Sequence, residues 1–315
     1  MKDLSIVFMG TPDFAVATLK TLVDNHYNIV GVITAPDKPA GRGRKLNESA
    51  VKKYAKENNL NILQPTNLKS ESFLKELKAL KANLQIVVAF RMLPKVVWQM
   101  PKYGTFNLHA SLLPNYRGAA PINWAIINGE TKTGVSTFFI DEKIDTGEMI
   151  LQEEVAIEPK ENAGSLHDKL MITGSQLVLK TVALIKKGSV TTKPQVDTDA
   201  IKTAHKLNRD NCKINWNDTI DNIYNLIRGL SPYPAAWCTL INGNEQLDIK
   251  IYEVEKEIEA HTLEIGSIIS TKNQLKVAVK NGYILIKEIK LPGKRTMHVG
   301  SLLNGYSLEK NAKML

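Results

Sequence analysis

Nearly unbroken apolar runs alternate with segments of helical spacing over the first two thirds of the chain. Residues 5–10, 28–34 and 84–90 are mostly apolar, a pattern typical of strands that helices cover on both faces. Apolar positions recur every three or four residues at 11–25 and 71–82, as in amphipathic helices. The strand–helix–strand order predicts an α/β domain with a doubly wound, mostly parallel sheet.

The pattern changes after this first part. Residues 190–206 are polar and lack sustained periodicity, which predicts a linker. Short strand-like segments follow at regular spacing, which predicts a small antiparallel β-barrel of the OB type. A chain of 315 residues is longer than one core usually serves. We therefore expect a catalytic domain at 1–189, a linker at 190–206 and a barrel at 207–315.

Composition excludes several classes of protein. Hydrophobic residues make up 43% and charged residues 23%, as in ordinary globular proteins. Two cysteines cannot build a disulfide framework, and no Cys/His cluster has zinc spacing. The first residues lack a signal-peptide pattern, and no apolar stretch is long enough to cross a bilayer. We expect a cytoplasmic monomer without a metal or a membrane; its net charge of +9 permits a polyanionic partner.

The segment "FNLHASLLPNYRGAAPI" at 106–122 places two polar side chains at the end of an apolar strand. Side chains alternate along a strand, so Asn107 and His109 point to one side while Phe106 and Leu108 point toward a core. Ligands of open parallel sheets bind outside the carboxyl ends of the strands. This position is therefore a candidate for chemistry.

Asp145 adds a carboxylate from the loop "DEKIDTGE" at 141–148. Each of the three polar residues alone is more often structural, but together at adjacent strand ends they indicate a site. No serine stands in a nucleophile elbow, and one His with one Asp is too few ligands for a metal. Acid–base chemistry with stabilisation of an oxyanion remains.

The segments 106–122 and 141–148 together resemble the signature of the 10-formyltetrahydrofolate-dependent formyltransferases. The opening "FMGTPDFA", the loop "APDKPAGRGRKL" and the second domain resemble the branch of that family that acts on tRNA. The resemblance extends over essentially the whole chain. One departure is the run from Ala89 to Pro94, which is one residue shorter than usual and has Arg91 where glycine is common.

The resemblance implies an enzyme that transfers the formyl group of 10-formyltetrahydrofolate to the α-amine of initiator methionyl-tRNA, for translation initiation. It implies that Asn107, His109 and Asp145 are catalytic. Asn107 and His109 would stabilise the oxyanion, and Asp145 would orient His109 and help remove the proton of the amine. It implies folate contacts from the loop Ser111, Leu112, Leu113 and Pro114.

Two basic segments are candidates for contact with tRNA. The glycine-rich loop 37–45 carries Arg42, Arg44 and Lys45, and the resemblance favours binding of the acceptor end over a merely solvated loop. The run "KEIKLPGKR" carries Lys287, Lys290, Lys294 and Arg295. Such runs are usually solvated, but here we expect salt-sensitive support of the acceptor arm.

Several alternatives stay open. The same three polar groups would serve a formyltransferase that acts on a small amine, although such an enzyme would not need the basic loop or the barrel. A folate-derivative hydrolase would leave those parts without a role. A non-catalytic RNA-binding protein on the same scaffold would not need the three polar groups. A dinucleotide enzyme is disfavoured because no G-x-G-x-x-G follows the first strand.

Overall fold

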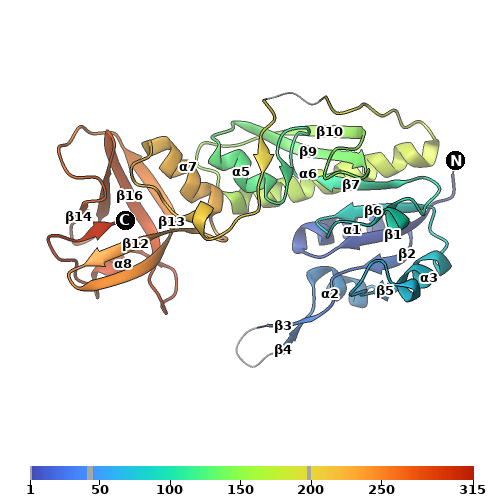
Figure 1. Cartoon of the computed structure of the whole chain (residues 1–315), viewed down its shortest axis with the longest axis horizontal. Coiled ribbons are helices and arrows are strands. Elements are labelled where there is room, and N and C mark those ends of the chain that lie inside the picture. Colours follow the sequence, from blue (N-terminus) through green and yellow to red (C-terminus); the bar gives the residue numbers. More distant parts are fainter. Residues whose placement is uncertain (1, 41–44, 197–199) are drawn as a thin grey trace. The chain divides into compact units, whose positions relative to one another are not determined.

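The computed structural model describes residues 2–40, 45–196 and 200–315. The chain separates into two compact units, which are described one at a time (Figure 1). The first unit contains Met1–Gly118, Thr133–Val155 and His167–Thr203. The second contains Ala119–Lys132, Ala156–Leu166 and Ala204–Leu315.

The first unit is built on one twisted sheet. Neighbouring strands β1, β2, β5, β6 and β7 run parallel, and β9 pairs antiparallel with β7. The order across the sheet is β10 (Met149–Ala156), β9 (Lys132–Phe139), β7 (Thr105–His109), β6 (Leu84–Val88), β1 (Ser5–Gly10), β2 (Asn28–Ile33) and β5 (Ile62–Leu63). The predicted mostly parallel, doubly wound α/β domain is confirmed.

Both faces of this sheet are covered, which explains the unbroken apolar strands. Val7 and Met9 of β1 pack in a cluster with Phe73 and Leu77 of α3. On another strand, Leu108 of β7 lies against Gly174 of α6, where an added Cβ would meet its side chain at 2.8 Å. The helices of this unit are α1 (Asp13–Asp24), α2 (Ala50–Glu57), α3 (Glu71–Ala79), α4 (Lys95–Trp98) and most of α6 (Ala163–Lys187).

A short hairpin of β3 (Lys38–Ala40) and β4 (Lys45–Asn47) extends from the region next to α2 (Figure 1). Its base is held by Asp37, which accepts hydrogen bonds from Lys52 and, at 2.9 Å, from Gln64 Nε2. Arg42 and Arg44, which we expect to bind tRNA, lie outside the described residues. Lys45 is the first residue of β4.

The polar segment predicted as a linker runs against the first unit where it is described. Lys193 forms an antiparallel bridge with Met149 of β10. Further along, the Tyr116 amide donates to the Lys202 carbonyl at 2.6 Å, and β11 (Thr203–Ala204) pairs with β8 (Arg117–Gly118). This segment therefore contributes structure to the first unit.

The second unit is a nearly closed, six-stranded antiparallel barrel, as predicted. A bridge between Ser267 and Lys313 links the strands at the two opposite ends of the sheet, so the barrel is nearly closed. The order is β14 (Ile268–Ser270), β15 (Leu275–Val279), β16 (Gly282–Lys290), β13 (Glu245–Glu257), β12 (Ala236–Asn242) and β18 (Lys313–Met314), and β17 (Met297–His298) pairs with β16.

Three helices accompany the barrel. Ile223, Ile227 and Leu230 of α7 (Ile220–Leu230) belong to the barrel core. α5 (Pro121–Ile127) packs on α7 at Gly229, where an added Cβ would come within 2.7 Å of the Ile127 side chain. The third helix is α8 (Val299–Leu303). In the part of the chain that the structure covers, no helix combines the length and apolar character needed to traverse a membrane.

Burial of both cysteines leads to a prediction about their reactivity. Cys212 and Cys238 lie in the barrel core, with 3% and 0% of their surface exposed, and burial raises the pKa of each thiol. Because the thiolate is the reactive form, we expect slow reaction with Ellman's reagent at pH 8 in the native protein. After unfolding in guanidinium chloride, both thiols should react as fast as N-acetylcysteine. Fast reaction of either thiol without denaturant would contradict this packing.

Candidate active site

The candidate site lies at the carboxyl end of β7. His109 is 6% exposed, and Asn107 is half-buried on the same side of the strand. Phe106 and Leu108 on the other side are buried. The Asn107 side chain makes no hydrogen bond to any other described residue, so its amide is available to a ligand.

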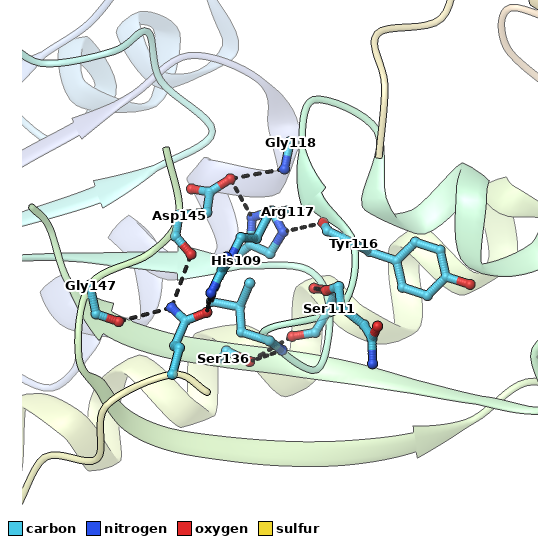
Figure 2. Close-up of polar contacts among 11 residues, drawn as sticks. His109, Ser111, Tyr116, Arg117, Gly118, Ser136, Asp145 and Gly147 are labelled. Carbon is cyan, nitrogen blue, oxygen red and sulfur yellow. Dashed lines mark hydrogen bonds and ion pairs between the residues drawn. The ribbon is translucent and has the colours of Figure 1, made fainter. Parts of the chain in front are cut away.

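The imidazole of His109 has one fixed nitrogen and one that faces a carboxylate (Figure 2). Its Nε2 lies 2.8 Å from the Tyr116 carbonyl oxygen. Because a carbonyl only accepts, Nε2 carries the proton of this hydrogen bond. Nδ1 lies 3.8 Å from Asp145 Oδ2, too far for a direct hydrogen bond but close enough for an ion pair when the ring is protonated.

The Asp145 carboxylate is held from the other side by backbone. The Gly118 amide donates to Asp145 Oδ2 at 3.0 Å. Asp145 itself has a φ of 55°, in the left-handed region that aspartate adopts more readily than most residues. At Gly147, an added Cβ would lie 1.7 Å from the Phe139 carbonyl oxygen, so only glycine fits there. The loop thus directs a carboxylate toward the end of β7.

Gln195, from the polar segment that follows α6, completes this loop. Its Nε2 donates to the carbonyl oxygens of Asp145 at 2.9 Å and Gly147 at 2.8 Å. Its Oε1 accepts from Arg117 Nε at 3.1 Å and from the same guanidinium's second nitrogen at 2.8 Å (Figure 2). One carboxamide therefore joins the Asp145 loop to the segment that carries Gly118.

The predicted folate loop is braced by Ser136 of β9 (Figure 2). The Ser136 hydroxyl donates to the Ser111 carbonyl at 2.6 Å and accepts from the Leu113 amide at 3.1 Å. Ser111 has no exposed surface and Leu113 has 3%, whereas Leu112 and Pro114 are partly exposed. Ser111 and Leu113 therefore shape the loop, and the surfaces of Leu112 and Pro114 are open to a ligand.

A cavity of about 510 Å³ lies in the same unit. Its wall includes the unusual run around Arg91, together with Lys69, Lys95 and Trp98, and Glu142 of the Asp145 loop. The Arg91 guanidinium donates to the Thr66 carbonyl at 2.9 Å, and burial lowers its pKa. Leu68, Leu93 and Met92 also line the cavity, and Met92 exposes 66% of its surface. The cavity thus combines apolar surface with cationic groups.

The structure brings some of the predicted residues together and leaves others apart. It places His109 beside Asp145, with Asn107 on the same strand face. In the second unit, Lys287 forms an ion pair with Glu255 at 2.7 Å, while Lys294 and Arg295 are exposed. No group of three His, Cys, Asp or Glu side chains suited to a metal occurs within residues 2–40, 45–196 and 200–315.

Three supporting residues were not predicted from the sequence: Ser136, Gln152 and Gln195. Gln152 Nε2 donates to the Leu113 carbonyl at 2.8 Å and to the Ser136 hydroxyl at 2.9 Å. None of the three stands in a local motif that would reveal its contacts. The polar run "KPQVD" gives no hint that Gln195 reaches back 50 residues to the Asp145 loop.

Comparisons with known proteins show the family of the chain. Residues 4–182 match the family model described as "Formyl transferase". Residues 206–307 match the model described as "Formyl transferase, C-terminal domain". The methionyl-tRNA formyltransferase of Flavobacterium johnsoniae is 65% identical over 314 residues, which cover 100% of each chain.

Solved structures share the fold at low identity. The sugar 3N-formyltransferase WlaRD, solved with dTDP and 5-N-formyl-THF, has a TM-score of 0.65 at 22% identity, covering 94% of this chain and 100% of its own. HypX from Aquifex aeolicus, solved with tetrahydrofolic acid, has a TM-score of 0.65 at 15% identity, covering 98% of this chain and 49% of its own.

The Gln195 contacts predict a loss of turnover without loss of the fold. Gln195→Ala removes two donors to the Asp145 loop, and each such hydrogen bond contributes on the order of 1 kcal/mol. We expect kcat to fall about tenfold, and the melting temperature to fall by only a few degrees. Gln195→Glu should be worse, because a carboxylate cannot donate to those carbonyls. Gln246→Ala, at an exposed barrel position, is the matched control; equal kcat values for all the variants would refute the role of Gln195.

Proposed function

Because this chain belongs to the formyl transferase family, we propose a reaction for the site at the end of β7. The chain is a formyltransferase that acts on methionyl-tRNA in translation initiation. The observation that carries the assignment is the combination of 65% identity along the full chain with a carboxylate, an imidazole and an amide at one strand end. We further propose a cytoplasmic monomer, with the catalytic domain at 1–189, a linker at 190–206 that packs on this domain through Lys193 and Gln195, and the barrel at 207–315.

The formyl donor is 10-formyltetrahydrofolate. The residues around the site fit such a group: Leu112 and Pro114 present partly exposed apolar surface for a flat heterocycle. The neighbouring cavity supplies Trp98 for an aromatic ring, and Lys69 and Arg91 for carboxylates. Ser111 and Leu113 hold the loop from within the protein.

The acceptor is the α-amine of methionine esterified to tRNA. Esterification removes the carboxylate that normally stabilises the ammonium form, so the amine loses its proton more readily than that of free methionine. Binding then has to orient the nitrogen lone pair against the formyl carbon. As the new C–N bond forms, the formyl oxygen becomes an oxyanion.

Asn107 and His109 stabilise that oxyanion. The Asn107 amide is not used by other described residues and donates to the oxygen. His109 donates from Nδ1 when that nitrogen is protonated, since its Nε2 is occupied by the Tyr116 carbonyl. One donor of this kind is worth about 3–4 kcal/mol in the transition state.

Asp145 stabilises the positive charge of a protonated His109 ring and of the amine as it attacks the formyl carbon. Its carboxylate lies 3.8 Å from His109 Nδ1, and it accepts the proton that leaves the amine, directly or through one water. Collapse of the intermediate breaks the bond from the formyl carbon to the folate nitrogen, which leaves with the proton that Asp145 took from the amine, so that Asp145 is again a carboxylate. The products are N-formylmethionyl-tRNA and tetrahydrofolate.

The basic loop 37–45 is proposed to meet the acceptor end of the tRNA. Arg42, Arg44 and Lys45 supply charge for phosphates at the end of a flexible nucleic acid. Asp37 and its partners hold the base of the hairpin from which this loop extends. A small acceptor would not need these residues.

Substitution at the site should separate chemistry from folding. We expect Asn107→Ala and His109→Ala to reduce single-turnover formyl transfer by about 10²–10³. Asp145→Asn keeps the acceptor for the Gly118 amide but removes the charge, so it should lose activity while the melting temperature holds. Asn244→Ala in an exposed barrel turn should behave as wild type. Near-normal turnover in all three site variants would exclude this mechanism.

The acceptor can be tested directly. The wild-type chain with 10-formyltetrahydrofolate should formylate methionine on charged initiator tRNA and leave free methionine unmodified. The reason is that methionine esterified to tRNA has an amine of low proton affinity, and its tRNA carries the phosphates that we propose the protein binds. Efficient formylation of free methionine or of an amino sugar would favour the small-amine alternative, and tRNA binding without turnover would favour a non-catalytic protein.

A further inference from the structure

One face of strand β9 carries the loop 111–114. Positions 134 and 136 of the strand lie on this face, since side chains alternate along a strand. At Gly134, an added Cβ would meet the Leu112 side chain at 2.5 Å and the Glu153 carbonyl oxygen at 2.2 Å, so Leu112 lies directly on the backbone of β9. Ser136 has no exposed surface and bonds to the loop on both sides of Leu112. The loop is therefore seated on two positions of one strand.

The Ser136 hydroxyl uses its full capacity for hydrogen bonds. It donates its one proton to the Ser111 carbonyl at 2.6 Å and accepts from the Leu113 amide at 3.1 Å (Figure 2). It also accepts from Gln152 Nε2 at 2.9 Å, and the same Nε2 donates to the Leu113 carbonyl at 2.8 Å. A hydroxyl has one proton and two lone pairs, so these three bonds define its orientation. The amide and the carbonyl of Leu113 are thus both held by side chains.

Ser136 is also the cross-strand neighbour of His109. In the antiparallel pairing of β7 with β9, His109 lies opposite Ser136. Side chains that are opposite in this way lie on the same face of the sheet, with their Cβ atoms about 4.5–5.5 Å apart. The side chain that holds the loop therefore stands beside the imidazole. One pair of bonded strands sets the position of the loop relative to the His109 ring.

We propose that Ser136 is a positioning residue for the formyl donor, because it holds the loop 111–114 in the conformation that binds the folate beside His109. The inference rests on the proposed function, since it takes the folate as the ligand of this loop. Ser136 is fully buried, so it acts through the exposed surfaces of Leu112 and Pro114. A loop with several conformations binds its ligand more weakly, in proportion to the population of the competent one. Loss of the hydroxyl should therefore weaken donor binding.

The next residue of β9 provides a matched control. Thr137 lies on the opposite face, where its hydroxyl is 2.8 Å from that of Thr181 in α6. Thr137 is as fully buried as Ser136. Thr137→Val removes a buried hydroxyl without affecting the loop contacts, whereas Ser136→Ala removes the hydroxyl that holds the loop. The two variants should lose a similar amount of stability, so a difference in donor binding between them reports the loop alone.

Donor binding and turnover are measured on the full-length chain and its variants. Isothermal titration calorimetry with tetrahydrofolate, which has no formyl group to transfer, gives a Kd. Steady-state formylation of methionyl-tRNA gives kcat and the KM of each substrate. We expect Ser136→Ala to raise the Kd for tetrahydrofolate and the KM for 10-formyltetrahydrofolate about 5- to 30-fold, because two bonds to the loop are lost.

The other kinetic constants should stay close to those of the wild type. Saturating donor restores the competent loop, so kcat of Ser136→Ala should change by less than about twofold. Its KM for methionyl-tRNA should be unchanged. Thr137→Val should match the wild type in both KM values and in kcat.

Gln152→Glu gives a second test at an exposed position, where the variant is expected to fold. A carboxylate cannot donate the two hydrogen bonds that Nε2 makes. The KM for the donor should therefore rise, by less than in Ser136→Ala because the serine hydroxyl remains. Gln246→Glu, at an exposed barrel position, makes the same change of charge elsewhere and should behave as wild type.

Two results would overturn the proposal. One is an equal donor affinity in Ser136→Ala and Thr137→Val, which would mean that the loop is held without Ser136. The other is a fall in kcat with an unchanged KM for the donor, which would mean that Ser136 acts on His109 instead. Failure of the proposed function is distinguishable, because the wild type would then neither bind tetrahydrofolate nor formylate methionyl-tRNA.

Discussion

The site depends on holding one carboxylate beside one imidazole without letting them bond directly. Asp145 sits 3.8 Å from His109 Nδ1 because its oxygen is held by the Gly118 amide and its backbone by Gln195. A left-handed residue in a short loop would otherwise have several accessible conformations. The hydrogen bonds from two other segments select one of them. The charge arrangement at the end of β7 follows from that selection.

This constraint explains why so many polar contacts surround the candidate site at the end of β7. The Tyr116 carbonyl occupies His109 Nε2, Ser136 braces the loop at 111–114, and Gln195 joins the Asp145 loop to Arg117. All of these groups lie in the first unit and none needs to touch substrate. Rigid placement of a few groups is what makes electrostatic stabilisation of a transition state effective.

Sequence patterns were sufficient to predict the fold and to bring Asn107, His109 and Asp145 together at the end of β7. Unbroken apolar strands predict the buried sheet, and alternation along β7 correctly separates Asn107 and His109 from the core side. The contacts of Gln195 were beyond reach, because they join positions 50 and 78 residues apart through a segment with no periodicity. The register of β13 against β16 was also beyond reach, because these two strands pair through irregularities that a sequence does not reveal.

Gln195 also changes where the catalytic part of the molecule ends. The formyl transferase match stops at residue 182 and helix α6 stops at Lys187, so either boundary would look like a natural place to cut the chain. A fragment ending there would keep Asn107, His109 and Asp145, yet it would lack the carboxamide that holds the last of these in place. During synthesis the same reasoning applies: the nascent chain cannot complete the proposed site until the stretch leading toward the barrel has left the ribosome.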